Sequence, residues 1–133
     1  MGLLSRMRDL WSKERPPELT IDTPDLVVVA SAFDPAEADS AVLARSPEWR
    51  PDEPAVLRHH LSLPADQVER ARELLTQDDW TLRCDLSEGS PLHAVRVQKL
   101  DALHCAQERS RMAGLAQRLG GDALGWDALQ PAR

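Results

Sequence analysis

Residues 55–63 read AVLRHHLSL, and this stretch decides the fold because its apolar and polar side chains alternate along the chain. Such alternation is typical of a β-strand with one face against a core and the other facing away. The face predicted to be covered holds Leu57, His59, Leu61 and Leu63. The opposite face holds Val56, Arg58, His60 and Ser62.

The segments that follow alternate between helix and strand signals. Helical spacing marks residues 64–77 and 101–119, and Gly120-Gly121 is typical of the end of the second helix. Alternation predicts further strands over 80–86, 93–98 and 124–130. Residues 55–130 therefore predict the order β-α-β-β-α-β, a ferredoxin-like split βαβ fold of the α+β class. Its helices would cover one face of an antiparallel sheet and leave the other open.

The chain before residue 55 predicts three further parts. Residues 1–15 form an amphipathic helix, residues 16–24 a linker, and residues 25–130 one α+β domain whose ferredoxin-like core is 55–130. The domain begins with an extra strand over 25–33 and a helix that starts at Asp34-Pro35. The extra strand would either extend the sheet or pack at its edge.

Composition favours an intracellular protein that binds proteins. With 133 residues the chain is one domain in size, and its net charge of −6 disfavours unspecific attraction to nucleic acid. Two cysteines, Cys84 and Cys105, make no disulfide framework, so we expect a reducing cytoplasm. The scarcity of lysine beside many arginines and alanines indicates a bacterial genome rich in GC.

Residues 1–13 combine apolar and basic side chains, which leaves open either docking on the domain or peripheral contact with a membrane.

No pattern of residues predicts catalysis, a metal or a cofactor. The four histidines and two cysteines lack the spacing of a zinc site, because His59 and His60 are consecutive on a strand and point to opposite faces. Neither cysteine lies in a recognisable nucleophile motif. We therefore expect a protein that is not an enzyme.

The predicted open face holds the candidate partner-binding residues. They are Arg58, His60, Arg83 and Arg96. Basic side chains on an open sheet fit a protein partner or, alternatively, RNA, which such sheets bind through stacked aromatic rings. Direct RNA binding is the weaker alternative, since the chain has no tyrosine and one phenylalanine.

Two motifs resemble a known family. Residues 57–63, LRHHLSL, and 112–126, MAGLAQRLGGDALGW, resemble the regulator of ribonuclease activity B (RraB) family of ribonuclease E inhibitors, and the resemblance spans roughly residues 41–129. The family's His-His-Leu-Ser begins here at His59 and His60. Its ending of tyrosine, aspartate, glycine and tryptophan is matched at Gly125 and Trp126, while Ala123 and Leu124 replace the first two residues.

The resemblance implies a function as well as a fold. Members of that family are ferredoxin-like α+β proteins that bind ribonuclease E without catalysis and limit RNA decay. An acidic inhibitor is complementary to the arginine-rich scaffold of such a ribonuclease. From the residues themselves we expect His60 to face a partner and Trp126 to be a core residue whose indole nitrogen needs an acceptor.

Overall fold

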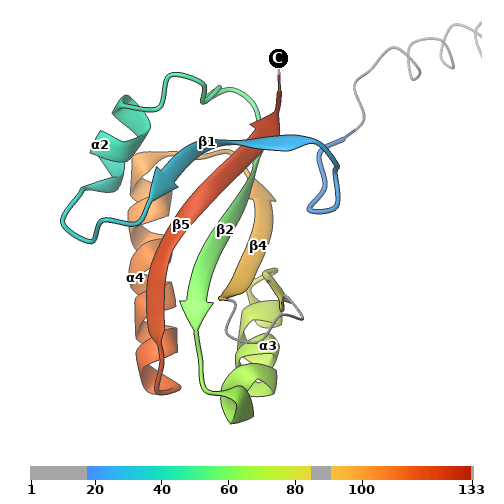
Figure 1. Ribbon diagram of the computed structural model, residues 1–133, viewed down its shortest axis with the longest axis vertical. Helices are drawn as coiled ribbons and strands as arrows, with labels where there is room; N and C mark the ends of the chain where they lie inside the picture. The colour runs from blue at the N-terminus through green and yellow to red at the C-terminus, as the bar shows by residue number, and fades with distance from the viewer. Residues whose placement is uncertain (1–17, 85–90, 133) are drawn as a thin grey trace, which may run out of the picture.

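The computed structural model describes residues 18–84 and 91–132, which fold into one antiparallel sheet with helices packed against it (Figure 1). The predicted α+β class is confirmed. The predicted helix over 1–15 lies outside the described residues, as does the end of the strand predicted over 80–86. The strands are β1 (Leu26–Ala32), β2 (Ala55–Ser62), β3 (Thr81–Arg83), β4 (Leu92–Gln98) and β5 (Asp122–Pro131). The helices are α2 (Asp39–Ala44), η1 (Ala65–Gln67), α3 (Val68–Gln77) and α4 (Ala102–Arg118).

The five strands follow the spatial order β1-β5-β2-β4-β3, and every neighbouring pair is antiparallel. The β2 strand lies at the centre, between β5 and β4. The β1 strand pairs with the outer side of β5, so the extra N-terminal strand extends the sheet rather than packing on its edge.

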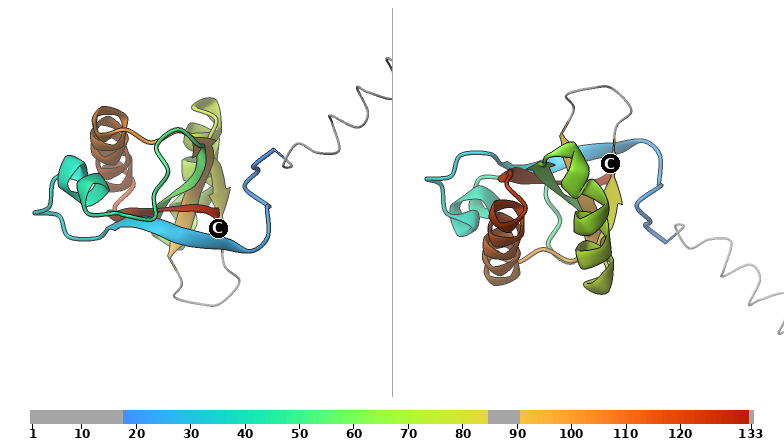
Figure 2. Two further views of the ribbon diagram at one scale, coloured as in Figure 1. Left: turned by 90° about the horizontal axis from the view of Figure 1, so that it is seen from above. Right: turned by 90° about the horizontal axis from the view of Figure 1, so that it is seen from below.

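All three α-helices lie on one side of the sheet, as the views along the sheet show (Figure 2). We call this side the covered face and the other side the open face. The core between helices and sheet includes Leu57 and Leu61 of β2, Met112 of α4 and Trp126 of β5, each at most 2% exposed. The alternation predicted for β2 is confirmed, because Leu57, His59 and Leu61 all belong to the buried side.

Local signals explain the ends of α4. The Asp101 carboxylate accepts a hydrogen bond from the His104 backbone N–H at 2.8 Å, which caps the first turn. At the other end Gly120 has φ +82°, a conformation that favours glycine, and the helix stops there as predicted. Gly121 lies so close to β2 that a Cβ there would be 2.0 Å from the Ser62 carbonyl oxygen.

Two predicted boundaries are wrong. The Asp34 carboxylate accepts from the Ala36 N–H at 2.9 Å and so stabilises a turn, and α2 begins only at Asp39. The strand predicted over 80–86 is confined to Thr81–Arg83 within the described residues.

The face assigned to β4 is also wrong. The sequence predicts that Arg96 lies on the open face, but the register pairs Leu57 with Arg96 and His59 with Ala94. Cross-strand partners share a face, so Arg96 lies on the covered face and Val95 on the open face.

Within the described residues, no helix has both the length and the apolar character needed to cross a membrane.

Candidate functional site

The open face brings together polar side chains from four strands. Three of the four candidate binding residues, Arg58, His60 and Arg83, lie on it. The register also places His93 beside His60 and Asp127 beside Arg58. Asp127 was missed from the sequence, although its alternation with Trp126 along β5 already puts it opposite the core.

Arg58 and Asp127 form the central ion pair of the open face. Arg58 Nε and Nη2 donate to the two carboxylate oxygens at 2.8 and 2.6 Å, and the Asp127 side chain is 7% exposed. Burial by itself would raise the pKa of Asp127, but hydrogen bonding and charge attraction from Arg58 and His60 together outweigh it, and the pKa lies below its ordinary value. The same pairing raises the pKa of Arg58. Both groups are therefore held charged and fixed in orientation.

His60 joins this pair to two further rings. Its Nε2 lies 3.1 Å from Asp127 Oδ1, close enough for an ion pair with a protonated ring although outside the geometry of a regular hydrogen bond. The ring meets those of His93 and Phe33 edge to face, with centroid distances of 4.3 and 4.9 Å. Phe33 is 47% exposed, so this cluster reaches the surface.

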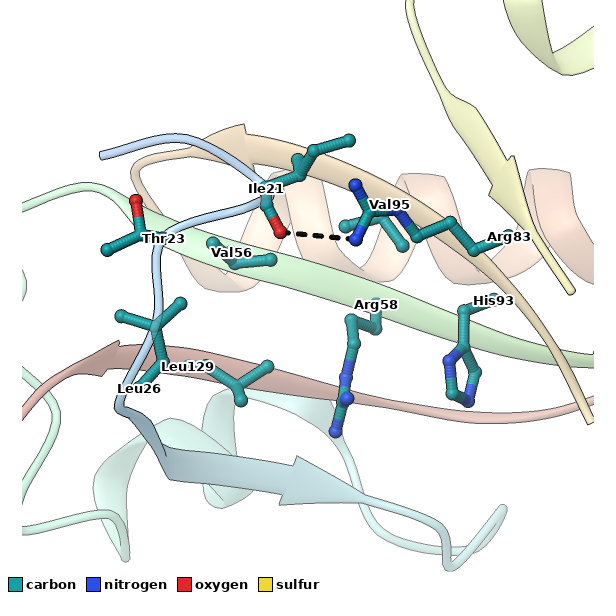
Figure 3. Close-up of a pocket in the computed structure, with 9 residues that line it drawn as sticks. All are labelled: Ile21, Thr23, Leu26, Val56, Arg58, Arg83, His93, Val95 and Leu129. Carbon is teal, nitrogen blue, oxygen red and sulfur yellow. Dashed lines mark hydrogen bonds between the residues drawn. The ribbon is translucent and has the colours of Figure 1, made fainter. Parts of the chain in front are cut away.

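A cavity of about 320 Å³ adjoins the cluster, where the segment before β1 crosses the open face (Figure 3). Its apolar wall includes Val56 and Val95, each 3% exposed although neither belongs to the core on the covered face. Its polar wall consists of Arg58, Arg83 and His93. The remaining lining residues are Ile21, Thr23, Leu26 and Leu129.

Arg83 ties the crossing segment to the sheet. Its guanidinium donates to the Ile21 carbonyl oxygen at 3.4 Å and pairs with the Asp22 carboxylate. The open face is therefore partly roofed by residues that sequence reasoning had assigned to a linker.

Arg96, the fourth candidate, is occupied on the covered face. Its guanidinium lies 4.0 Å from the Trp80 ring centroid and donates to Glu108 of α4 at 2.6 Å and to the Asp78 carbonyl oxygen at 2.9 Å. These contacts neutralise the charge and join the end of α3 to α4, so Arg96 has a structural role.

The motif residues behind the family resemblance are cross-strand neighbours. His59 pairs with Trp126 and His60 with Gly125, although the two motifs are far apart in the sequence. Gly125 has φ +141°, and a Cβ there would be 2.4 Å from the Ala32 carbonyl oxygen. His59 is 2% exposed and meets Trp80 edge to face at 5.2 Å, and burial lowers its pKa to about 3. Packing therefore explains three of the four motif residues, namely His59, Gly125 and Trp126.

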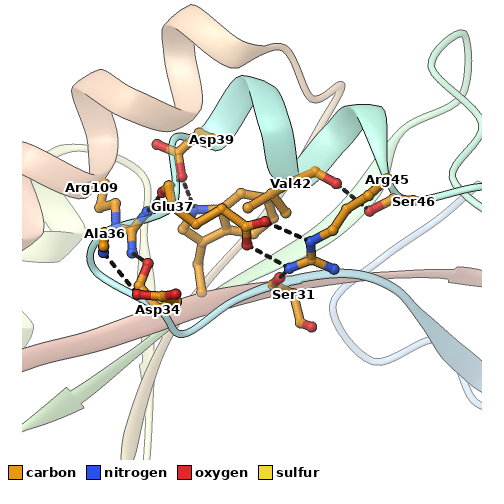
Figure 4. A network of polar contacts seen from close by, with 10 residues as sticks. Ser31, Asp34, Ala36, Glu37, Asp39, Val42, Arg45, Ser46 and Arg109 are labelled. Carbon is orange, nitrogen blue, oxygen red and sulfur yellow. Dashed lines mark hydrogen bonds and ion pairs between the residues drawn. The ribbon is translucent and has the colours of Figure 1, made fainter.

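A polar network that includes Asp39 and Arg109 lies where α2 meets α4 (Figure 4), and it anchors Trp126. Its indole nitrogen donates to Asp39 Oδ1 at 3.1 Å, and Arg109 donates to the same oxygen at 2.8 Å. Arg45 binds both oxygens of Glu37 and the Ser31 carbonyl oxygen, which fastens α2 to β1. Trp126 thus has the acceptor predicted for it.

A second cavity, of about 400 Å³, lies between α4 and the start of β5. His59, Arg109 and Leu124 are among its lining residues. His59 Nε2 is buried and has no hydrogen-bond partner among the described residues. Nothing in the lining selects one class of ligand over another.

Among the described residues, no group of three or more His, Cys, Asp or Glu side chains is arranged so that it could hold a metal ion. Cys105 is buried, and burial raises the pKa of its thiol to about 12, so it stays protonated and is a poor nucleophile.

Comparisons with protein-family models, with curated proteins and with solved structures gave no match. The resemblance to the regulator of ribonuclease activity B family rests on the two motifs alone, and in this chain those motifs meet across β2 and β5.

Proposed function

We propose that this protein is a noncatalytic regulator that binds another protein on its open face and, by its resemblance, inhibits ribonuclease E and so limits RNA decay. The observation that carries the proposal is the cavity on the open face, whose apolar wall adjoins fixed charges. Such a mixture of apolar surface and a few placed polar groups suits a protein segment.

The state of the charged groups supports binding over catalysis. Arg58 and Asp127 satisfy one another, and such a pair presents a fixed pattern of charge to a partner. The imidazole of His59, with a pKa of about 3, does not exchange protons near neutral pH.

RNA binding receives less support from the open face. Arg96 lies on the covered face, while Arg58 and Arg83 each have a carboxylate partner. Phosphate binding would need free cations, and base stacking would need exposed rings in number.

We also propose that β2 to β5 form a ferredoxin-like unit to which β1 and α2 are added. The support is the spatial order β5-β2-β4-β3, with antiparallel neighbours and with α3 and α4 on one face. Along the chain these elements run β2, α3, β3, β4, α4, β5, which is the β-α-β-β-α-β order of a split βαβ arrangement.

A binding experiment with purified ribonuclease E tests the proposed function. Immobilised full-length chain should retain ribonuclease E at low salt, and adding the chain should slow decay of a ribonuclease E substrate RNA. Arg83→Glu should weaken both effects, because it reverses a charge beside the cavity. Arg70→Glu is the matched control, since Arg70 is an exposed arginine on α3, away from the open face.

Two outcomes would contradict the proposal. One is the absence of ribonuclease E binding at low salt. The other is tight retention of single-stranded RNA on a filter by the chain alone, with a steep salt dependence that Arg58→Ala and Arg83→Ala remove, which would favour the RNA alternative.

A further inference from the structure

Basic side chains predominate among the polar groups that line the cavity on the open face. Among the residues that the structure describes, its lining includes two guanidinium groups and one imidazole, from Arg58, Arg83 and His93, and no carboxylate. In Figure 3 these three side chains lie around one side of the cavity, across from Leu26 and Leu129. The lining therefore suits an occupant that carries negative charge beside apolar groups.

One carboxylate of the chain already reaches this site from its rim. A turn over residues 20–23, in which Thr20 N–H donates to Thr23 Oγ1 at 2.9 Å and Asp22 N–H donates to Thr20 Oγ1 at 3.2 Å, presents the Asp22 side chain to Arg83. Asp22 thus shows what kind of group Arg83 accepts.

The Asp22–Arg83 pair is suited to exchange. The Asp22 side chain is 76% exposed and that of Arg83 is 42% exposed, so water solvates both groups when they separate. Exposed ion pairs of this kind contribute little stability, and another carboxylate can replace Asp22 at small cost.

Arg58 differs from Arg83 in this respect. Its bidentate bond to the 7% exposed carboxylate of Asp127 holds it in place, so Arg58 contributes a fixed wall rather than an exchangeable partner. The exchangeable cation of the cavity is Arg83.

We propose that this cavity binds an acidic, otherwise apolar segment of the partner protein, whose carboxylate takes the place of Asp22 on Arg83. The apolar side chains of that segment pack on Val56, Val95 and Leu129. Asp22 acts as a built-in competitor that keeps the site closed to weak ligands. This inference rests on the proposed function and names the chemistry of the partner at that site.

Selection from a phage-displayed library of random dodecapeptides tests the proposal on the full-length chain. The wild-type protein should enrich peptides with an aspartate or glutamate among apolar residues. Fluorescence anisotropy then compares the most enriched peptide with a copy whose acidic residue is replaced by its amide. We expect the amide copy to bind about tenfold more weakly, as for loss of a charge-assisted hydrogen bond.

Two variants separate the competitor from the receptor. Asp22→Asn should tighten binding of the acidic peptide about two- to fivefold, which is the range expected from loss of an exposed ion pair. Arg83→Gln should abolish the preference for the acidic peptide over its amide copy. Asp66→Asn in η1 and Arg70→Gln in α3 change exposed charges elsewhere. They should alter neither the affinity for the acidic peptide nor the preference for it over its amide copy.

The proposal is overturned if no peptide is enriched, if the enriched peptides are not acidic, or if Asp22→Asn leaves affinity unchanged. These outcomes are distinct from failure of the proposed function. If ribonuclease E binds the wild type, if Arg83→Glu weakens that binding, and if the selected peptides are not acidic, the proposed function stands and this inference fails. Acidic selection without ribonuclease E binding does the reverse.

Discussion

His59 and His60 are consecutive in the sequence and differ in almost every physical respect. His59 lies under the helices, is 2% exposed, and has a pKa lowered to about 3 by burial. His60 lies on the open face, near the carboxylate of Asp127 and the rings of His93 and Phe33. One step along a strand therefore separates a residue buried beneath the helices from one that lies on the open face.

The two faces also differ in how their interactions are made. The core on the covered face consists of apolar side chains that pack against one another and form no ion pairs. On the open face the contacts include ion pairs, and the pair of Asp22 with Arg83 is exposed to solvent. We therefore expect substitutions on the covered face to change stability, and substitutions on the open face to change binding.

The largest expected effect is that of Trp126→Ala on the covered face. Trp126 is fully buried and donates its indole hydrogen to Asp39, so truncation leaves a cavity and removes a partner of a buried carboxylate. We expect the free energy of unfolding to fall by about 3–5 kcal/mol. Urea denaturation followed by circular dichroism measures it, with Leu103→Ala, at a 64% exposed position, as the control. A loss below 1 kcal/mol would mean that Trp126 is not a core residue.

The next effect concerns His59 and pH. Because the folded-state pKa of about 3 lies below the ordinary value of 6.5, the unfolded chain takes up the proton first, and stability falls as pH decreases from about 6.5 toward 3. Within this window we expect His59 to account for about 1.4 kcal/mol of unfolding free energy per pH unit.

Comparison of variants isolates this contribution. The slope of unfolding free energy against pH should decrease in His59→Gln, whatever that variant does to stability at neutral pH. Leu103→Ala, which changes an exposed side chain without a titratable group, should retain the wild-type slope within this window. Equal slopes in His59→Gln and the wild type would show that His59 is not held neutral by burial.

A smaller effect tests how closely β5 approaches β1. Gly125→Ala places a Cβ against the Ala32 carbonyl oxygen at a φ of +141°, and we expect a loss of at least about 1 kcal/mol of unfolding free energy. Gly114→Ala in α4 is the matched control, because a Cβ there meets nothing within 4 Å. Alanine should raise helix stability at that position by about 0.8 kcal/mol. Thermal denaturation of both variants should therefore give shifts of opposite sign.

The smallest effect is expected away from the core, at the exposed part of β1. Val28 is 52% exposed, so Val28→Thr keeps the β-branched shape and should change unfolding free energy by less than about 0.5 kcal/mol. Val42→Thr in α2 makes the same change at a fully buried position and should cost about 1–3 kcal/mol. Similar losses measured by urea denaturation at the two sites would contradict the assignment of the faces.

Much of the fold could be predicted because its signals are local. The alternation of β2, the stripe of α4 and the glycines that end it are each set by neighbouring residues, and the structure agrees with them. The prediction for Arg96 failed because alternation shows which residues share a face and does not show which face is covered. Trp80 and Glu108 make the covered side favourable for a guanidinium, and neither lies on β4.

The sequence by itself determined the α+β class, the order of most elements and the need of Trp126 for an acceptor. The tertiary structure alone decided that Arg58 meets Asp127, that the residues before β1 roof part of the open face, and that Asp22 reaches Arg83. The physical reason is range. Hydrogen bonding and side-chain periodicity act between residues near in the chain, whereas an ion pair or a cavity wall forms only where folding brings distant segments together.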